Sequence, residues 1–163
     1  MSKTSGRYVA VLWSLALIVV VVDQLTKAWA VSALTSSRRI DVLGHWLGLV
    51  LVRNPGAAFS FATGQTWVFT AVAVVVTVIV LRVSRRLGSM WWAATLGLVL
   101  GGAVGNLIDR LARDPGIFRG HVVDFIDYGG LFVGNVADIA IVGVAGRFPG
   151  APDTGALAAR LRA

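Results

Sequence analysis

The sequence predicts a membrane all-α fold: a four-transmembrane-helix bundle with short strands in the loops between the helices. The first observation behind this prediction is composition. Of the 163 residues, 56% are hydrophobic and only 14% are charged, and the mean hydropathy is +0.78. Soluble domains carry about a quarter charged residues. The second observation is a set of four apolar runs that can cross, or nearly cross, a hydrocarbon layer about 30 Å thick. We expect one membrane domain over residues 1–163.

The first span is expected at residues 8–33, after a short basic start. A secretory signal peptide has a similar outline, and the small-x-small pattern at residues 28–30 could act as its cleavage site. The run is longer than the apolar core of a signal peptide, and Asp23 and Lys27 lie before the supposed cut. We therefore interpret this segment as a retained helix.

The loop after the first span covers residues 35–65. Within it, Ile40–Val52 is rich in β-branched residues and contains two glycines, which predicts short strands. Residues 53–56, with the sequence Arg-Asn-Pro-Gly, predict a turn. This turn could be a plain connection, or it could present its amides to an extended peptide.

The remaining spans follow in order along the chain. The second is expected at residues 66–82 and the third at 90–109, and both lack internal charges over most of their length. Val122–Ile126 predicts another strand in the loop after the third span. The fourth span is expected at 135–150, although a charge and prolines follow its apolar part early, and the tail at 151–163 is atypical.

The charge is strongly basic. The chain has fifteen Lys and Arg residues, eight Asp and no Glu, and the net charge is +7. The basic residues mostly flank the apolar runs, which favours contact with lipid headgroups over nucleic acid. They divide almost evenly between the two predicted sides of the membrane. Because the first span usually dominates orientation, we expect both termini in the cytoplasm.

Ionisable residues at membrane depth are costly and usually functional, so we divide the aspartates by whether they lie in polar or apolar segments. Three of them lie in polar stretches and are expected to be solvated loop charges: Asp41, Asp114 and Asp153. The other five lie in or beside apolar segments, and the predicted topology brings all of them to the extracytoplasmic face: Asp23, Asp109, Asp124, Asp127 and Asp138.

Asp124 and Asp138 have different local settings. Asp124 lies inside an apolar strand, where a lone carboxylate needs a partner, and strand alternation points it away from Asp127. Asp138 is expected as the third residue of a helix capped by Asn135. An anion there is also favoured by the helix dipole, so a purely capping role is the plain interpretation of Asp138.

Two carboxylates in a partly dry site share a proton, so that one can act as a base toward water while the other polarises a carbonyl. The sequence contains no competing catalytic pattern. It has no Cys, no Gly-x-Ser-x-Gly and no His-Glu-x-x-His. His45 and His121 lie in different loops, so we expect no metal site.

Five ordered motifs make the chain similar to a known family. They are Asp23-Gln24-Leu25-Thr26-Lys27, the stretch Arg53 to Ser60, the stretch Gly101 to Arg110, Val122-Val123-Asp124-Phe125, and Asn135-Val136-Ala137-Asp138. Together with four spans, these motifs resemble the bacterial lipoprotein signal peptidases, also called signal peptidase II or prolipoprotein signal peptidase. The chain looks like an actinobacterial member, and the resemblance covers roughly residues 8–145.

The resemblance implies an aspartic endopeptidase of the bacterial cytoplasmic (inner) membrane. Family members remove signal peptides from diacylglyceryl-modified prolipoproteins, cleaving before the lipidated Cys at the extracytoplasmic face. The family fold has four transmembrane helices and a small extracytoplasmic β-sheet cradle. Family members act on prolipoproteins, contact membrane lipids and are inhibited by globomycin, and the resemblance implies no metal or other cofactor. The family's catalytic aspartates match Asp124 and Asp138. Residues that match supporting or substrate-binding positions are Asn54, Gly56, Asn106, Arg110, Asn135, Asp23 and Lys27.

Spacing gives some of these supporting residues a physical role of their own. Lys27 can pair with Asp23 four residues earlier, or it can extend its side chain to the membrane interface. Asn106 and Arg110 share a helix face, and the glycines near them favour close helix packing.

The chain departs from the family pattern in two places. Gly134 stands where the family usually has Phe, which predicts looser support of Asp138. The apolar part of the fourth span is short, which leaves open a non-catalytic membrane scaffold or an altered C-terminus. A transporter with aspartate proton relays is a further alternative. The gathering of acids at one face, instead of across the midplane, disfavours it.

Overall fold

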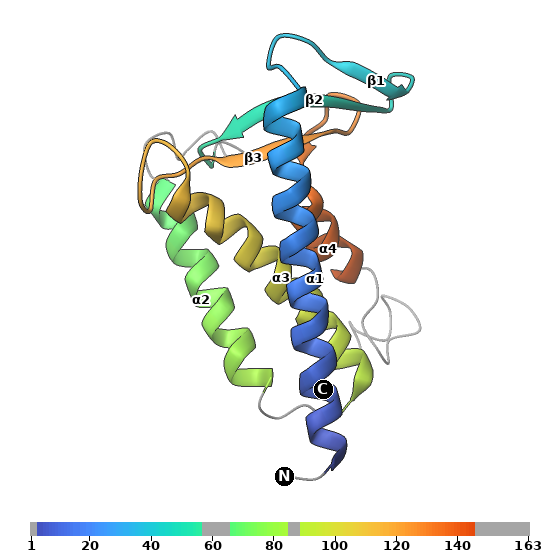
Figure 1. Cartoon of the computed structure of the whole chain (residues 1–163), viewed down its shortest axis with the longest axis vertical. Coiled ribbons are helices and arrows are strands. Elements are labelled where there is room, and N and C mark those ends of the chain that lie inside the picture. Colours follow the sequence, from blue (N-terminus) through green and yellow to red (C-terminus); the bar gives the residue numbers. More distant parts are fainter. Residues whose placement is uncertain (1–2, 57–65, 85–88, 146–163) are drawn as a thin grey trace, which may run out of the picture.

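The computed structural model describes residues 3–56, 66–84 and 89–145 (Figure 1). Its helices are α1 (Lys3–Ala33), α2 (Thr66–Ser84), α3 (Met90–Ala112) and α4 (Val136–Ala145). All four apolar runs therefore contain a helix. The expected continuation of the fourth span to residue 150, and the tail at 151–163, lie outside the described residues. Within the described part, two helical stretches are long and apolar enough to cross a membrane, Gly6–Ala33 and Met90–Ala112.

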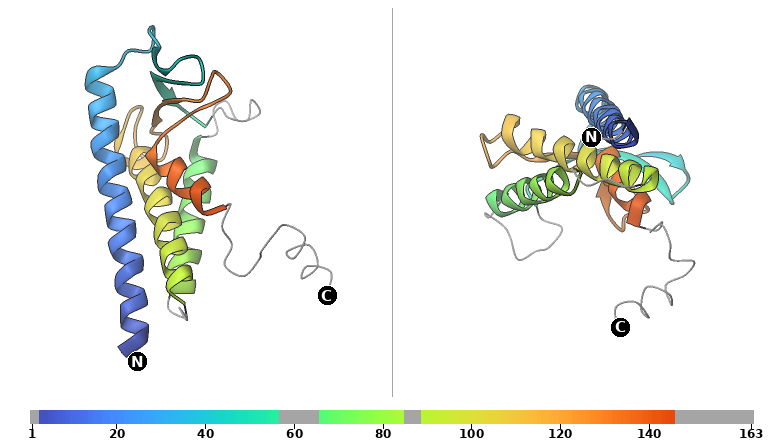
Figure 2. Two further views of the ribbon diagram at one scale, coloured as in Figure 1. Left: turned by 90° about the vertical axis from the view of Figure 1, so that its right-hand side faces the viewer. Right: turned by 90° about the horizontal axis from the view of Figure 1, so that it is seen from below.

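Helix α3 lies at the centre of the helical part, with α1, α2 and α4 packed around it (Figure 2). Glycines on α3 allow this close packing. A Cβ at Gly97 would lie 2.7 Å from the Leu12 carbonyl oxygen of α1, and a Cβ at Gly102 would lie 2.7 Å from the Ala137 carbonyl oxygen of α4. Such distances are too short for any side chain, so small residues set the helix spacing.

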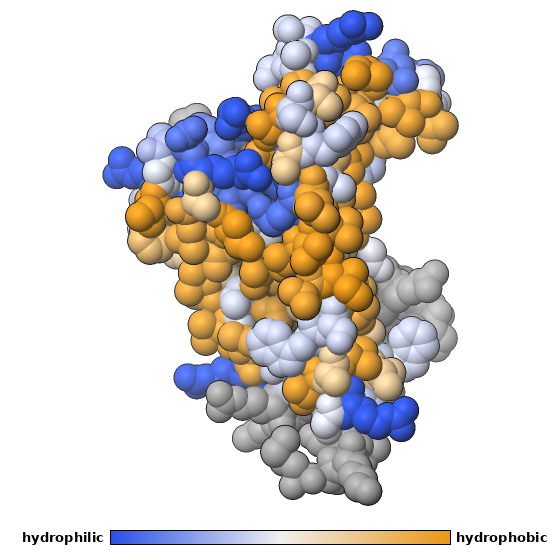
Figure 3. Space-filling model, in the orientation of Figure 1, coloured by the Kyte–Doolittle hydropathy of each residue, from blue (hydrophilic) through white to orange (hydrophobic). Residues whose placement is uncertain are grey.

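The helices share an apolar core and also carry an apolar outer surface. The buried cluster joins α1, α2 and α3 and consists of Leu12, Ala16, Val80, Ala93 and Leu100. Outward-facing residues such as Leu17 and Ile79 are more than half exposed, and Figure 3 shows a broad hydrophobic band over the helices with hydrophilic residues toward both ends. An apolar surface this extensive is unfavourable in water and suits a lipid environment.

The loops contribute one antiparallel sheet with the order β1-β2-β3-β4. Its strands are β1 (Ile40–Leu43), β2 (Leu47–Asn54), β3 (Val122–Asp127) and β4 (Val133–Gly134), so the strands predicted from the sequence are present. Asp41 was expected in a polar loop, but it lies in β1 and pairs in register with Gly48. Its side chain is exposed, as expected for a solvated charge.

The sheet packs on the end of α1 through a second apolar cluster, made of Ala30, Leu34, Leu51, Val123 and Phe125. Strand alternation therefore turns Val123 and Phe125 toward α1 and turns Asp124 to the opposite face. The pairing of β3 with β4 places Asp124 beside the residues that follow β4, at the start of α4.

Candidate active site

Asp124 lies in the middle of β3, opposite Val52 of β2, with a side chain that is 2% exposed. Two amide nitrogens compensate the burial of its carboxylate. Asn54 Nδ2 donates to Oδ2 at 2.8 Å, and Asn135 Nδ2 donates to Oδ1 at 2.6 Å. The expectation that a lone aspartate in an apolar strand needs partners is confirmed.

Asp138 is the third residue of α4; it caps the helix and contacts Asn135, one of the two amide partners of Asp124. The backbone N–H of Asn135 donates to Asp138 Oδ2 at 3.1 Å, and the Asp138 N–H donates to Asn135 Oδ1 at 3.1 Å. The other carboxylate oxygen, Oδ1, accepts a hydrogen bond from Asn106 Nδ2 at 3.2 Å. The capping interpretation is therefore correct but incomplete, because one oxygen remains directed at the site.

The two carboxylates also interact through their charges. Burial raises the pKa of Asp124 to about 6; the hydrogen bond from Asn54 opposes this rise, and the negative charge of Asp138 adds to it. A carboxyl with such a pKa exchanges its proton near neutral pH, which general acid–base chemistry requires.

Asn54 reaches Asp124 because of the turn that ends β2. The N–H of Gly56 donates to Asn54 Oδ1 at 2.8 Å, and Gly56 has a φ of +108°, a conformation that favours glycine. With its oxygen held by this donor, the Asn54 amide must direct its nitrogen toward Asp124. Arg110 supports the same turn, since its Nη1 donates to the carbonyl oxygens of Asn54 at 3.2 Å and Gly120 at 3.1 Å.

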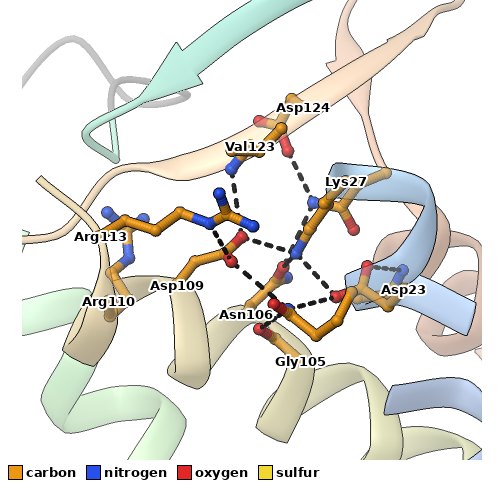
Figure 4. Close-up of polar contacts among 12 residues, drawn as sticks. Asp23, Lys27, Gly105, Asn106, Asp109, Arg110, Arg113, Val123 and Asp124 are labelled. Atoms are coloured by element: carbon orange, nitrogen blue, oxygen red, sulfur yellow. Dashed lines mark hydrogen bonds and ion pairs between the residues drawn. The ribbon is translucent and has the colours of Figure 1, made fainter. Parts of the chain in front are cut away.

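A buried ionic cluster lies below Asp124 in the view of Figure 4 and joins residues of α1 and α3. Lys27 is fully buried, and its Nζ lies 2.9 Å from Asp23 Oδ2 and 2.8 Å from Asp109 Oδ2. The same nitrogen donates to Asn106 Oδ1 at 2.9 Å. The pairing with Asp23 is confirmed, and the alternative of a lysine extended to the interface is wrong, because α1 turns this face toward α3.

Asp109 and Gln24 belong to this cluster but are not among the predicted catalytic, supporting or substrate-binding residues, although Asp109 is one of the five aspartates expected at this face. Asp109 accepts from Arg113 Nε at 2.6 Å and from the Val123 N–H of β3 at 3.2 Å. Gln24 Nε2 donates to the Gly105 carbonyl oxygen at 3.1 Å. The i,i+4 spacing of Asp109 and Arg113 was a usable signal for that pair. Nothing in the local sequence indicated the contact of Gln24.

Asp23 connects α1 to the start of α4. Its Oδ1 accepts a hydrogen bond from the Ala137 N–H at 3.1 Å, one of the helix donors that has no partner inside α4. Its Oδ2 lies against Gly105, where a Cβ would come within 2.6 Å. Asp23 therefore fixes the first turn of α4, which carries Asp138.

Two cavities open beside the carboxylates. One of about 480 Å³ includes Asp124, Asn54 and Pro55, and one of about 270 Å³ includes Asp138 and extends along α4 past Val142. Phe132 lines both cavities and stacks on Tyr128 with 4.5 Å between ring centroids. The walls of both cavities are largely apolar and include a few polar side chains, as is common for binding sites.

Gly134 affects Asp138 in a way that the family pattern did not indicate. A Cβ at this position would lie 3.1 Å from Asp138 Oδ2 and 3.5 Å from the ring of Phe132. A side chain at 134 would therefore press on the carboxylate. The glycine leaves room for the present arrangement of Asp138 and Phe132.

Other candidate residues lie apart from the carboxylates. Asp127 faces Arg39, and the hydrogen bond from Arg39 lowers the pKa of Asp127. His45 lies at the β1–β2 turn and His121 precedes β3. In the described ranges, no three His, Cys, Asp or Glu side chains gather closely enough to hold a metal ion. Asp153 is outside the described residues.

The fold and site define a class of membrane protein: an apolar helical bundle with a carboxylate pair enclosed at one end by a small sheet. A family model described as signal peptidase (SPase) II matches residues 15–148. The chain therefore belongs to the signal peptidase II family, as its motifs predicted.

Similar proteins agree with this assignment. A lipoprotein signal peptidase of Rhodococcus jostii is 53% identical over 131 residues, which are 80% of this chain and 66% of that protein. One from Mycolicibacterium smegmatis is 50% identical over 137 residues, 84% of this chain and 58% of that protein. The chain thus spans roughly three fifths to two thirds of these relatives. A solved structure described as a bacterial membrane enzyme at 2.3 Å resolution superposes with a TM-score of 0.70 at 26% identity, covering 86% of this chain and 83% of the other.

Proposed function

We propose that this protein is an aspartic endopeptidase that removes signal peptides from diacylglyceryl-modified prolipoproteins, cleaving before the lipidated Cys. The observation that carries the proposal is that Asn135 contacts both carboxylates: its side-chain nitrogen donates to Asp124 and its backbone N–H donates to Asp138. Membership of the signal peptidase II family and similarity to lipoprotein signal peptidases support the choice of substrate.

The proposed reaction uses one ionised and one protonated carboxyl. The ionised group takes a proton from water as the water oxygen attacks the peptide carbonyl carbon, and the protonated group gives its proton to the carbonyl oxygen. In the resulting tetrahedral diol the C–N bond then breaks. The leaving nitrogen gains a proton from one carboxyl, and a diol hydroxyl returns one to the other. The pair ends with the single proton it began with, and one water has been consumed.

The surrounding residues would bind and orient the peptide. Asn54 and Pro55 border the cavity beside Asp124, where an extended substrate segment would meet the end of β2. The cavity along α4, bordered by Ile139 and Val142, would take an apolar part of the same substrate. Arg110 would act indirectly by holding the β2 turn through backbone carbonyls.

We further propose that residues 1–163 form one membrane domain with four spans in the bacterial cytoplasmic membrane, both termini being cytoplasmic. The two long apolar helices α1 and α3 support this arrangement, as does Arg82 in the last turn of α2. The carboxylates then lie at the extracytoplasmic end, beside the sheet. Membrane lipids contact the apolar band, and globomycin-type inhibitors would compete for the substrate cavities.

Processing of a lipidated preprolipoprotein by the purified full chain tests the proposed function. We expect cleavage before the lipidated Cys, unaffected by a metal chelator and blocked by globomycin. Asp124→Asn and Asp138→Asn should each lower kcat by at least about a thousandfold, since each removes half of the acid–base pair. Asp41→Asn is the matched control, because Asp41 is an exposed aspartate of the same sheet. Full activity in either dyad variant would disprove the assignment, and a folded but inactive wild-type chain would disprove the function.

A further inference from the structure

The sequence has three asparagines, and the side-chain nitrogen of each donates to either Asp124 or Asp138. The amide oxygen of each asparagine in turn accepts from another donor. For Asn54 the donor is the Gly56 N–H, and for Asn135 it is the Asp138 N–H. Both of these are backbone groups. Asn106 differs, because its oxygen accepts from a charged side chain, the ammonium of Lys27, at 2.9 Å.

This difference matters because a primary amide can present either its oxygen or its nitrogen to a neighbour. An ammonium group only donates hydrogen bonds, so it fixes the Asn106 oxygen on the side of Lys27. The Asn106 nitrogen must then face Asp138 Oδ1, to which it donates at 3.2 Å. The other donor to the Asn106 oxygen is Asn135 Nδ2, at the longer distance of 3.2 Å.

We propose that Lys27 is a positioning residue of the peptidase site: by fixing the Asn106 amide it maintains Asp138 as the ionised base and leaves the shared proton on Asp124. This inference rests on the proposed function and assigns the two roles that the reaction requires. Lys27 acts on Asp138 through Asn106, whose oxygen accepts from the ammonium and whose nitrogen donates to the carboxylate.

The settings of the two aspartates agree with this assignment. Asp138 accepts the Asn135 N–H in the first turn of α4, where the helix dipole favours an anion, and it is only partly buried. Asp124 is almost fully buried and lies in a strand, and its raised pKa favours the protonated form. Without the Asn106 donor, Asp138 would lose one of its two hydrogen-bond donors.

Lys27 is surrounded by charges that balance. Asp23 on α1 and Asp109 on α3 contact it directly, and Arg113 pairs with Asp109 from the other side. Asp124 of β3 and Asp138 of α4 face the same region, together with Arg110. Two cations and two anions form the immediate cluster, so its net charge is zero. The specific contribution of Lys27 is therefore the directed hydrogen bond to Asn106.

This neutrality allows two charge-conserving double variants. Lys27→Met with Asp23→Asn removes one ion pair together with the donor to Asn106. Asp109→Asn with Arg113→Met removes the other ion pair and leaves the Lys27–Asn106 hydrogen bond in place. Each keeps the cluster neutral, which avoids an uncompensated buried charge. The second double variant is the matched control.

We expect the first double variant to lower kcat about tenfold to a hundredfold with KM changed by less than about twofold. The acidic limb of its pH profile of kcat should move up by about one pH unit. A shift of that size corresponds in free energy to the loss of about one hydrogen bond to a charged group. Asp109→Asn with Arg113→Met should keep the wild-type pH profile. Adding Asn106→Leu to the first double variant should change kcat little further, because Asn106 has already lost its fixed orientation when Lys27 is replaced.

Equal pH profiles in the two double variants, or additive effects of Asn106→Leu and the Lys27 change, would overturn the proposal and leave Lys27 as a structural cation. The infrared titration of the carboxyl groups gives a readout that does not depend on turnover. The protonated-carboxyl band should persist to higher pH in the first double variant only, and identical titrations would contradict the inference. If the wild type fails to cleave prolipoproteins, the proposed function fails, while this titration still tests Lys27.

Discussion

Asn135 and Asp138 cap the first turn of α4 reciprocally, each donating its backbone N–H to the side chain of the other at 3.1 Å. This is a capping box with aspartate in the place of the more common Glu or Gln. Asn135 also donates its side-chain nitrogen to Asp124 at 2.6 Å. The residue that starts the helix therefore also links the two carboxylates, so the start of α4 and the site geometry depend on each other.

Substituting Asn135 can separate these two roles. Asn135→Ser keeps a good N-cap but loses the donor to Asp124, so we expect stability within about 0.5 kcal/mol of wild type. Asn135→Ala loses both, and its free energy of unfolding should fall by about 1 kcal/mol. Both variants should lose about a hundredfold in kcat. Thermal unfolding in detergent and prolipoprotein cleavage measure the two effects, and an active Asn135→Ser variant would show that the amide donor is dispensable.

The pKa of Asp124 predicts how stability depends on pH. Its pKa is raised in the folded protein to about 6, so the fold favours the protonated carboxyl. The stabilisation is fully present below the unfolded pKa of about 3.9 and is lost as pH rises through about 6. Between pH 4 and 7 we expect wild type to lose about 2 kcal/mol relative to Asp124→Asn. Chemical unfolding of both proteins across this range measures the difference, and parallel curves would contradict it.

Gly105 should tolerate no side chain, because a Cβ there would lie 2.6 Å from Asp23 Oδ2. Moving Asp23 disturbs its ion pair with Lys27 and its hydrogen bond to the start of α4. We expect Gly105→Ala to cost about 2–3 kcal/mol of unfolding free energy and to lower activity. Gly6→Ala is the control, since a Cβ at Gly6 meets nothing within 4 Å. Equal thermal stability of the two variants would argue against tight packing at Gly105.

The sequence predicts the elements of this fold well because each carries its own local signal. Apolar runs indicate helices, and the β-branched residues and glycines of Ile40–Val52 indicate short strands. Asp124 is likewise predictable, because a carboxylate within an apolar strand needs partners wherever the strand packs. These inferences depend only on residues near one another in the chain.

The buried cluster is harder to predict because it depends on which way a helix face turns. The spacing of Asp23 and Lys27 is the same whether Lys27 points to α3 or to the membrane interface, so the sequence leaves both possibilities open. The contact between Gln24 and Gly105 joins residues far apart in the chain. Such contacts are set by the packing of α1 on α3, and no local pattern encodes them.

Gly56 provides a test of how the β2 turn supports the site. Its φ of +108° is strained for any other residue, and its N–H holds the Asn54 oxygen at 2.8 Å. We expect Gly56→Ala to cost about 1–3 kcal/mol and to release the Asn54 amide from its fixed orientation. Without that orientation, Asp124 loses its 2.8 Å donor, and kcat should fall about tenfold to a hundredfold.

Gly44→Ala is the matched control for Gly56→Ala. Gly44 also has a positive φ, +53°, but it lies in the β1–β2 turn, and a Cβ there would meet nothing within 4 Å. The control should therefore lose some stability and keep its kcat. Because Asn54 opposes the raised pKa of Asp124, its release should also move the ionisation of Asp124 to higher pH. Equal kcat values and equal carboxyl titrations in the two variants would show that the turn does not orient Asn54.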